Sequence, residues 1–370
     1  MTSTALLDVR ALNRATLERQ LLLGRVPGTA AGTVRHLAGM QAQAPRAAYV
    51  ALWSRLAGFR PEELAGLLTE RQVVRVVLMR GTVHLVTADD ALGMMALLRA
   101  TLDRRFGSSS FAKALTEVDL AEAAALSRKF LAAAPNSRKE LGAHLAERWP
   151  GTDPDALSAA GMYLVGCVQL PPRGLWDDVG PVVLSPLETW LDRPLDAAAT
   201  LDDLVLRFLG AFGPATVKDA QSWSGLTRLR EVFDRLRPGL AVFRGPAGEE
   251  LFDLPDAPRP DPETPAPVRF LPEYDNLLLS HADRSRVIVG RRAVPLPPGY
   301  GGAAGTVLVD GFFQGVWKIA REKGTAVLRI DPFVPPTAAQ RADMAAEGEA
   351  LLGFAAADAE AHDVRIGTPE

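Results

Sequence analysis

Three times along this chain, helix-like segments are followed by two short strand-like segments, and this recurrence limits the possible folds more than any other feature. The first copy has expected helices over 6–23, 33–37, 45–56 and 61–69. Strands rich in β-branched residues follow at 73–79 and 82–86, with an Arg-Gly turn between them, and indicate a β-hairpin. Helices followed by a β-ribbon are typical of a winged-helix unit.

The pattern returns twice. The second copy has helices over 137–148 and 153–167, and strands at 168–170 and 175–184. The third copy has helices over 201–212, 217–223 and 228–236, and strands at 240–244 and 250–254. Ser137 and Glu140 have the spacing of a capping box, which supports a helix start at that position.

The remainder of the chain differs in character. Six prolines within residues 255–267 indicate an extended linker. A β-meander over 307–330 and an amphipathic helix over 338–356 follow. We therefore predict an α+β fold of three tandem winged helix-turn-helix units, a C-terminal β-meander or small barrel, and a final helix. The predicted domains are 1–107, 108–198, 199–256 and 257–370.

Composition narrows the class of protein. With 370 residues the chain exceeds one compact core, and a net charge of −3 argues against a uniformly basic nucleic-acid binder. Of 41 basic residues six are lysine, which leaves 35 arginines. Arginine suits phosphate forks and base edges, although a genomic bias toward Ala, Gly, Pro and Arg explains the excess equally well.

Several kinds of site are not predicted. One cysteine, Cys167, excludes an internal disulfide and a Cys-rich metal site, and the five histidines lack metal-ligand spacing. We expect no metal and no cofactor. No run approaches the roughly 20 apolar residues of a membrane span, and no signal pattern opens the chain. We expect a cytoplasmic, nucleoid-associated protein that makes no membrane contact.

Two glutamines stand out in the first copy. Gln41 and Gln43 are separated by one small residue and lie in an expected turn between helices, with Pro45 suited to the first position of the next helix. Both amides can then face one cavity, where they could hold a water molecule or bind a base edge. A helix cap plus a solvated amide is the plainer alternative for an isolated pair of this kind.

Longer phrases of the sequence resemble a known family, the winged-helix DNA glycosylases of the AlkZ/YcaQ type. These phrases are QAQ (41–43), MRGTVHLVTADD (79–90), FGPATVKDAQSWSGL (212–226), LPEYDNLLLSHADRSRVI (271–288) and GVWKI (315–319). They span most of the chain in order. The Gln-x-Gln turn is similar to the AlkZ-like branch of the family, whereas the other branch has Gln-x-Asp.

The resemblance implies a function and a set of residues. It implies excision of alkylated guanine from double-stranded DNA, with Gln41 and Gln43 as catalytic residues and the hairpin over 73–86 as a DNA probe. On that hairpin the candidate DNA contacts are Arg75, Arg80, Thr82 and His84, of which His84 could equally be structural. In the third copy, Arg228 and Arg230 open the expected recognition helix.

The chemistry of the substrate agrees with neutral catalytic amides. Alkylation at N7 makes guanine cationic and weakens the glycosidic bond, so cleavage needs a positioned water rather than a strong acid. Glutamine cannot act as a general base, but its amide oxygen can orient water and place a negative dipole end near the developing oxocarbenium ion. No lysine lies near the glutamines in sequence, so we predict a monofunctional glycosylase. Three winged-helix units in one chain suggest a monomer that wraps DNA.

Two other functions fit the same pattern. A winged-helix transcription regulator would use these helices to read base pairs, without a glutamine pair, and would usually bind as a dimer with a palindromic footprint. A catalytically inactive relative that binds only drug or adduct is the third possibility. Release of an alkylated base separates the glycosylase from both.

Overall fold

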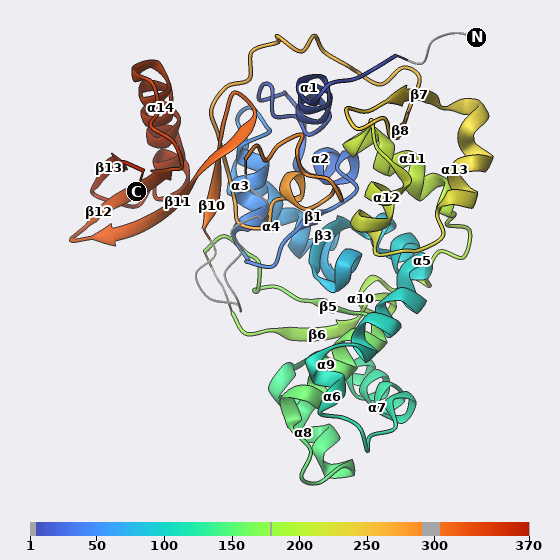
Figure 1. Ribbon diagram of the computed structural model, residues 1–370. Coiled ribbons are helices and arrows are strands. Elements are labelled where there is room, and N and C mark those ends of the chain that lie inside the picture. The colour runs from blue at the N-terminus through green and yellow to red at the C-terminus, as the bar shows by residue number, and fades with distance from the viewer. Residues whose placement is uncertain (1–4, 178–179, 291–303, 370) are drawn as a thin grey trace.

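The strands of the first two predicted wings lie side by side in one six-stranded sheet. The computed structural model describes residues 5–177, 180–290 and 304–369 (Figure 1). The sheet order is β1 (Met40–Gln41), β3 (Val83–Thr87), β2 (Val73–Val77), β5 (Cys167–Gln169), β6 (Val183–Pro186) and β4 (Asn136–Ser137). The prediction of two separate wings is therefore wrong. The pairing of β2 with β5 covers a backbone edge that an isolated hairpin would expose.

The first group of helices agrees with the sequence pattern. These helices are α1 (Val9–Arg19), α2 (Ala30–His36), α3 (Ala47–Trp53) and α4 (Pro61–Thr69). Asp8 caps α1 and Thr29 caps α2 by accepting backbone N–H groups. The hairpin strands β2 and β3 are joined by the 3-10 turn η1 (Met79–Gly81), where the Arg-Gly turn was expected.

A bundle of helices follows the hairpin and forms one end of the molecule (Figure 1). It contains α5 (Ala88–Gly107), α6 (Ser110–Lys113), α7 (Leu120–Ala133), α8 (Arg138–Arg148), α9 (Pro154–Val165) and α10 (Leu187–Leu191). The capping box of Ser137 and Glu140 is confirmed at the start of α8. The expected helices did not include α6, α7 or α10, although α7 is rich in Ala and Leu and is capped by Asp119.

The third predicted unit is present with nearly the expected bounds. Its elements are α11 (Leu201–Phe212), α12 (Val217–Ser224), α13 (Arg230–Leu236), the 3-10 turn η2 (Arg237–Gly239), β7 (Ala241–Arg244) and β8 (Glu250–Asp253). Only this unit keeps a two-stranded wing of its own. The count of three winged-helix units and the four domain boundaries stay predictions.

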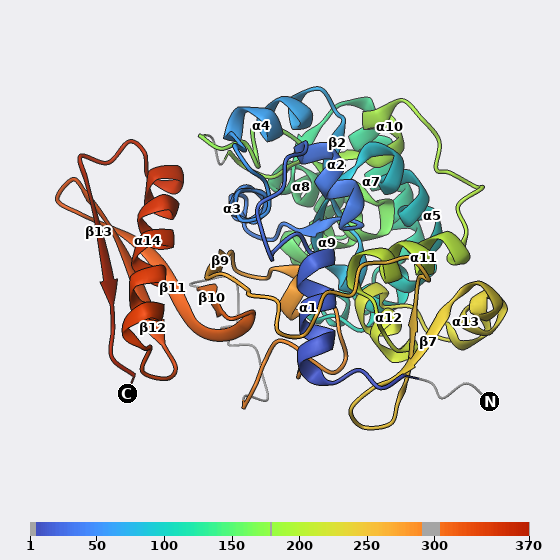
Figure 2. The same ribbon diagram turned by 90° about the horizontal axis from the view of Figure 1, so that it is seen from above.

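The C-terminal part forms an open sheet with one helix against it. The elements are β9 (Arg269–Leu271), the 3-10 turn η3 (Asn276–Leu278), β10 (Gly305–Val309), β11 (Phe312–Glu322), β12 (Thr325–Pro332), α14 (Ala338–Ala355) and β13 (Ala361–Ile366). The predicted meander is confirmed. A small barrel is not, because β13 and β9 are the two edges of the described sheet. Figure 2 shows α14, β12 and β13 projecting to one side of the other elements.

No helix in the described ranges combines the length and the apolarity needed to cross a bilayer. The buried residues form four apolar clusters, and three of these join residues from different predicted domains. Val50 of α3, for example, packs in the cluster of the C-terminal sheet. The fourth cluster lies within the first predicted domain, and the partly buried Leu175, Trp176 and Phe354 pack against it. The parts of the chain are therefore held together by shared cores.

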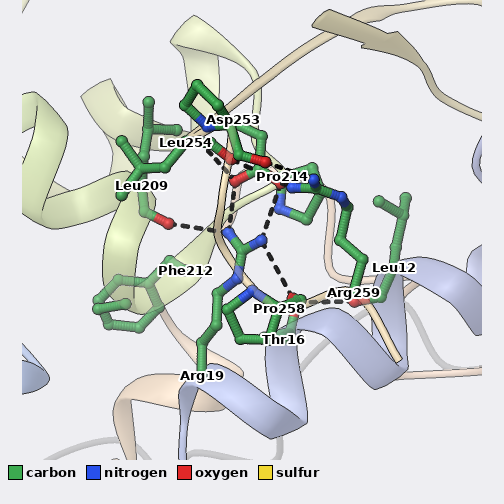
Figure 3. A network of polar contacts seen from close by, with 12 residues as sticks. Leu12, Thr16, Arg19, Leu209, Phe212, Pro214, Asp253, Leu254, Pro258 and Arg259 are labelled. Atoms are coloured by element: carbon green, nitrogen blue, oxygen red, sulfur yellow. Dashed lines mark hydrogen bonds and ion pairs between the residues drawn. The ribbon is translucent and has the colours of Figure 1, made fainter. Parts of the chain in front are cut away.

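A buried arginine joins the first helix to the third unit (Figure 3). Arg19 donates two hydrogen bonds to the carboxylate of Asp253, at 2.6 and 2.8 Å, and further bonds to the carbonyl oxygens of Leu209 and Pro258. Arg259 from the Pro-rich segment binds the same carboxylate. Both charges of the Arg19–Asp253 pair are fully buried, so each depends on the other for stabilisation.

Removal of that arginine should therefore destabilise the fold strongly. We expect Arg19→Met to lower the free energy of unfolding by about 3–5 kcal/mol, because Asp253 keeps a buried charge with fewer partners. The control is Arg321→Met, which removes an exposed pair with Asp358 and should cost about 0–1 kcal/mol. Urea unfolding of both variants measures the difference. Equal midpoints for the two variants would contradict this account.

Candidate active site

The segment between α2 and α3 places the two glutamines along the edge of the hairpin. Gln41 lies in β1, paired with His84 of β3, rather than in a free turn. Gly39 makes this approach possible. Its φ is +95°, and a Cβ at this position would lie 2.6 Å from Cγ1 of Val86. Only glycine therefore allows the chain to meet the hairpin so closely.

Hydrogen bonds fix the orientation of both glutamine amides. Nη2 of Arg80 donates to Oε1 of Gln41 at 2.8 Å, and the backbone N–H of Val83 donates to Oε1 of Gln43 at 3.2 Å. A guanidinium and a peptide N–H can only donate, so each amide oxygen must face its donor. The oxygens were expected to be free for a water molecule. Each is instead partly used and keeps one lone pair.

A distant loop holds the backbone of the same segment. Asn276 donates from Nδ2 to the carbonyl oxygen of Gly39 at 2.9 Å and accepts from the backbone N–H of Gln41 at 3.3 Å. The neighbouring Asp275 forms two 2.9 Å hydrogen bonds with Arg55, and both side chains are buried. The loop and the glutamine segment are therefore fixed to each other.

Arg80 carries a charge into the site. It is in the left-handed region with φ of 56°, and its Nη1 donates to the carbonyl oxygen of Trp223. Burial, together with the nearby charges of Arg105 and Arg284, lowers the pKa of Arg80 to about 10. Because this pKa remains above 7, the guanidinium is still cationic at neutral pH. The amide of Gln41 is thus bound by a positive charge.

His84 is a neutral part of the core. Its Nδ1 lies 2.9 Å from the carbonyl oxygen of Thr82, so Nδ1 carries the proton, and Nε2 lies 3.5 Å from Arg80. Burial and the charge of Arg80 lower the pKa of His84 to about 3. The structural alternative for His84 therefore fits its position, and a phosphate contact does not. Thr82 is half-buried and donates to the carbonyl oxygen of Met79.

Arg75 is also inside the protein, contrary to the prediction of a DNA contact. It lies in β2, its Nη2 donates to Oε1 of Gln169 at 3.3 Å, and its side chain is 2% exposed. Burial, with the charge of Arg173, lowers its pKa to about 10. In a strand with one solvent-exposed face, side chains alternate between the core and the solvent, and this alternation would expose Arg75. Here all residues of β2 are buried, and the chain at Gly174 packs directly against the side chain of Arg75.

The arginines of the third unit remain exposed. Arg228 precedes α13 in the left-handed region, with φ of 61°, so it does not open the helix as predicted. Arg230 is the first residue of α13 and forms ion pairs with Asp234 and Glu250. Neither contacts the glutamines. The structure thus groups Gln41, Gln43, Arg80, Thr82 and His84, and leaves the other three candidates elsewhere.

A cavity of about 430 Å³ opens beside the second glutamine. Its polar lining comes from Gln43, Gln169, Arg138, Arg173 and Glu273. Its apolar and aromatic lining includes Phe111, Met162, Val182, Tyr163 and Tyr274. This volume lies within the range of small-molecule sites, about 300–1,000 Å³. Of the nearest aromatics in sequence, the buried Tyr49 packs against Trp176, and the half-buried Trp53 packs against Phe354.

A second, basic pocket of about 270 Å³ lies at the tip of the hairpin. The tip, α5 and the turn that follows α12 surround it, and it is lined by Arg80, Gly81, Thr101, Arg104, Arg105, Ser108, Ser224, Gly225 and Thr227, with three leucines. Among the described residues, Arg105 has no carboxylate within ion-pair distance. A pocket of this chemistry suits a phosphate group.

Sequence patterns missed several of these residues for a simple reason. Asn276 and Glu273 follow Gln41 by more than 230 positions, and no spacing rule relates them. Their only signal was the phrase LPEYDN, where Asp275 and Asn276 could be read as a polar cluster. Arg105 lies on a helix whose exposed face is rich in arginine, so nothing in the sequence separates it from its neighbours. In the described part of the chain, no group of three His, Cys, Asp or Glu side chains could hold a metal ion.

Comparison with known proteins shows which fold this chain shares and which relative it resembles. The chain superposes on a solved structure, the Streptomyces sahachiroi DNA glycosylase AlkZ, with a TM-score of 0.74 and 21% identity, over 98% of this chain and 100% of the other. It is also 25% identical over 351 residues to an interstrand DNA cross-link repair glycosylase of Streptomyces sahachiroi, covering 86% of this chain and 88% of the relative.

The family follows from a third comparison. The model of the family "DNA glycosylase AlkZ-like" matches residues 34–354, which include both glutamines and the loop that holds them. The chain belongs to this family of AlkZ-like DNA glycosylases, as the resemblance of its motifs had indicated.

The depressed pKa of His84 predicts a dependence of stability on pH. The unfolded chain takes up a proton near pH 6.5, whereas the folded protein resists it until about pH 3. The contribution of His84 to stability is therefore full above pH 6.5 and is lost as the pH falls below it. Between pH 6.5 and pH 5 the loss should be about 2 kcal/mol.

Comparison of variants isolates this contribution. We expect His84→Gln to show a smaller loss of unfolding free energy between pH 7 and pH 5 than the wild type. His144→Gln, at a half-exposed position, is the control and should follow the wild type. Urea unfolding at the two pH values measures both. A wild-type pH dependence in His84→Gln would show that His84 is not the buried neutral group.

Proposed function

We propose that this protein is a monofunctional DNA glycosylase that hydrolyses the N-glycosidic bond of N7-alkylated guanine, including bulky and cross-linked adducts. It would act as a monomer on double-stranded DNA in the cytoplasm, without metal or cofactor. Its role would be base excision repair or self-resistance to a DNA-alkylating natural product. Membership of the AlkZ-like family and the relative named for interstrand cross-link repair both support the proposal.

The observation that carries the proposal is the pair of immobilised amides along the edge of the hairpin, of which Gln43 lines the cavity. Gln41 and Gln43 are fixed by Arg80, Val83 and Asn276, so neither amide needs to reorganise when the bond breaks. Each amide oxygen keeps one lone pair that can accept a proton of a water molecule. Such positioning can supply several kcal/mol of the barrier.

The reaction suits a cationic base. In N7-alkylguanine the ring is already positive, and its departure with the bonding electron pair yields a neutral base. An unmodified purine would leave as an anion and would need an acid to protonate it. His84 lacks the proton for this task at neutral pH, because its pKa is about 3. The site therefore favours the alkylated base over the normal one.

DNA binding would use the arginines around the hairpin tip. Arg80, Arg105 and Arg284 lie close enough for the other two charges to lower the pKa of Arg80. Ser108, Ser224 and Thr227 add hydroxyl groups to the pocket that Arg80 and Arg105 line. Guanidinium and hydroxyl groups are the usual ligands of DNA phosphates. This pocket would place a backbone phosphate next to Gln41, which Arg80 contacts directly.

The residues that line the cavity and the basic pocket support a monofunctional reaction. A bifunctional glycosylase needs an amine that attacks C1′. Neither the cavity beside Gln43 nor the basic pocket has a lysine among its described lining residues. Water is then the nucleophile, and an intact abasic site is the product.

The cavity supports the acceptance of bulky adducts. About 430 Å³ bounded by Phe111, Tyr163 and Tyr274 offers apolar surface for more than a methyl group. Because the hairpin borders this cavity through Val83, a large adduct could lie against the protein while the duplex stays outside. This would remove the size limit of a closed base pocket.

The first test removes the amides. Gln41→Ala and Gln43→Ala should each lower the single-turnover rate of base release by about 100-fold. DNA affinity should stay unchanged, since these residues act on water rather than on phosphate. Gln72→Ala, at an exposed position of the same unit, is the control. Wild-type rates in both active-site variants would defeat the assignment. Release of no base by the wild-type protein would instead favour a DNA-binding regulator.

The second test combines substrate size and mechanism. Duplexes carry N7-methylguanine, a mid-sized mustard monoadduct or an intercalating natural-product adduct at one position, and alkali-labile abasic sites are scored with and without borohydride. We expect rates that hold or rise with adduct size and no covalent protein–DNA product. Activity confined to the methyl adduct would refute the open site. A borohydride-trapped complex would reveal an attacking amine and refute the monofunctional class.

A further inference from the structure

The proposed reaction needs a group that accepts a proton from the attacking water, and neither the glutamines nor the arginines around them supply one. Arg80 is cationic and binds Gln41, His84 is neutral, and Arg138 and Arg173 line the cavity beside Gln43. Departure of the base builds positive charge on the sugar, and the attacking water must lose a proton. Amides can orient that water, but they are far too weak as bases to accept the proton.

Among the described residues that line the cavity, Glu273 is the one carboxylate. It shares this cavity with Gln43 and Val83, so it lies on the same side of the hairpin as the second glutamine. It forms no ion pair with a described residue, and its carboxylate accepts a hydrogen bond from its own backbone N–H. No described cation therefore neutralises its charge through an ion pair.

The loop that carries Glu273 is held in place on both sides. Before it, Leu271 of β9 is paired with Thr306 of β10. After it, Asp275 binds Arg55, and Asn276 binds the backbone of the glutamine segment at Gly39 and Gln41. Tyr274, between these anchors, is in the left-handed region with φ of 64°. A position pinned this way is suited to a group that must be preorganised for reaction.

The protonation behaviour of Glu273 agrees with such a role. Burial raises its pKa above that of an ordinary glutamate. A base with a higher pKa accepts a proton more readily, provided that it is ionised at the working pH. The titratable and charged groups that line the same cavity are Arg138 of α8, Tyr163 of α9, Arg173 and Tyr274.

We propose that Glu273 is a further catalytic residue, the general base that accepts a proton from the water attacking C1′. The bond between C1′ and N9 of the base breaks, and its electron pair neutralises the cationic N7-alkylguanine. The oxygen of water then forms its bond to C1′, while the proton passes to the carboxylate of Glu273. Gln43 orients the same water molecule. This inference rests on the proposed glycosylase function and adds a residue to it.

The test is single-turnover base release from a duplex with one N7-alkylguanine, between pH 5 and pH 8. E273Q keeps the size of the side chain and removes the charge, so it should fold normally and bind DNA with unchanged affinity. Its rate should fall by about 100-fold. The wild-type rate should rise with pH as Glu273 ionises, and E273Q should lose this rise. E273D, which keeps the charge on a shorter side chain, should recover part of the rate.

Glu62→Gln is the matched control, because Glu62 is exposed in the first turn of α4. It should keep both the wild-type rate and the wild-type pH profile. A wild-type rate in E273Q, or an unchanged rise with pH, would overturn the role of Glu273 while the glycosylase function stands. Failure of the wild-type protein to release any alkylated base would overturn the proposed function, and the role of Glu273 with it.

Discussion

The site depends on the buried ion pair between Arg55 and Asp275. Arg55 follows α3, and Asp275 begins η3, so the pair joins the first helices to a loop 220 residues later. Both side chains are almost fully buried, which makes each charge dependent on the other. The same loop then binds the glutamine segment through Asn276 and brings Glu273 to the cavity. One desolvated pair thus positions residues from both halves of the chain.

The hairpin is the second element on which several parts converge. Its strand β3 pairs with β1, which contains Gln41, and its strand β2 pairs with β5 from the second predicted unit. Its tip meets the turn after α12, where Arg80 binds the carbonyl oxygen of Trp223. The hairpin therefore contacts parts of all three predicted units.

The proposed cationic substrate has to fit a site that is rich in arginine. In the proposed reaction, Arg80, Arg105 and Arg284 would attract phosphate, but their charge would disfavour the positive sugar of the transition state. The neutral His84 adds no further positive charge, and the carboxylate of Glu273 would oppose the arginines on the side of Gln43. A phosphate-binding side that is separate from the reaction side would meet both demands in one site.

The sequence by itself determined the α+β class, most helix bounds, the third wing and the glutamine pair, because caps, turn residues and apolar periodicity are local signals. The bounds of α4 and α11 show this, since they agree with the pattern to the residue. Only the tertiary structure decided that two wings merge into one sheet, that Arg75 and His84 are buried, and that Arg80, Asn276 and Glu273 surround the glutamines. Those outcomes come from strand pairing and side-chain contacts between segments far apart in the chain, which local periodicity does not encode.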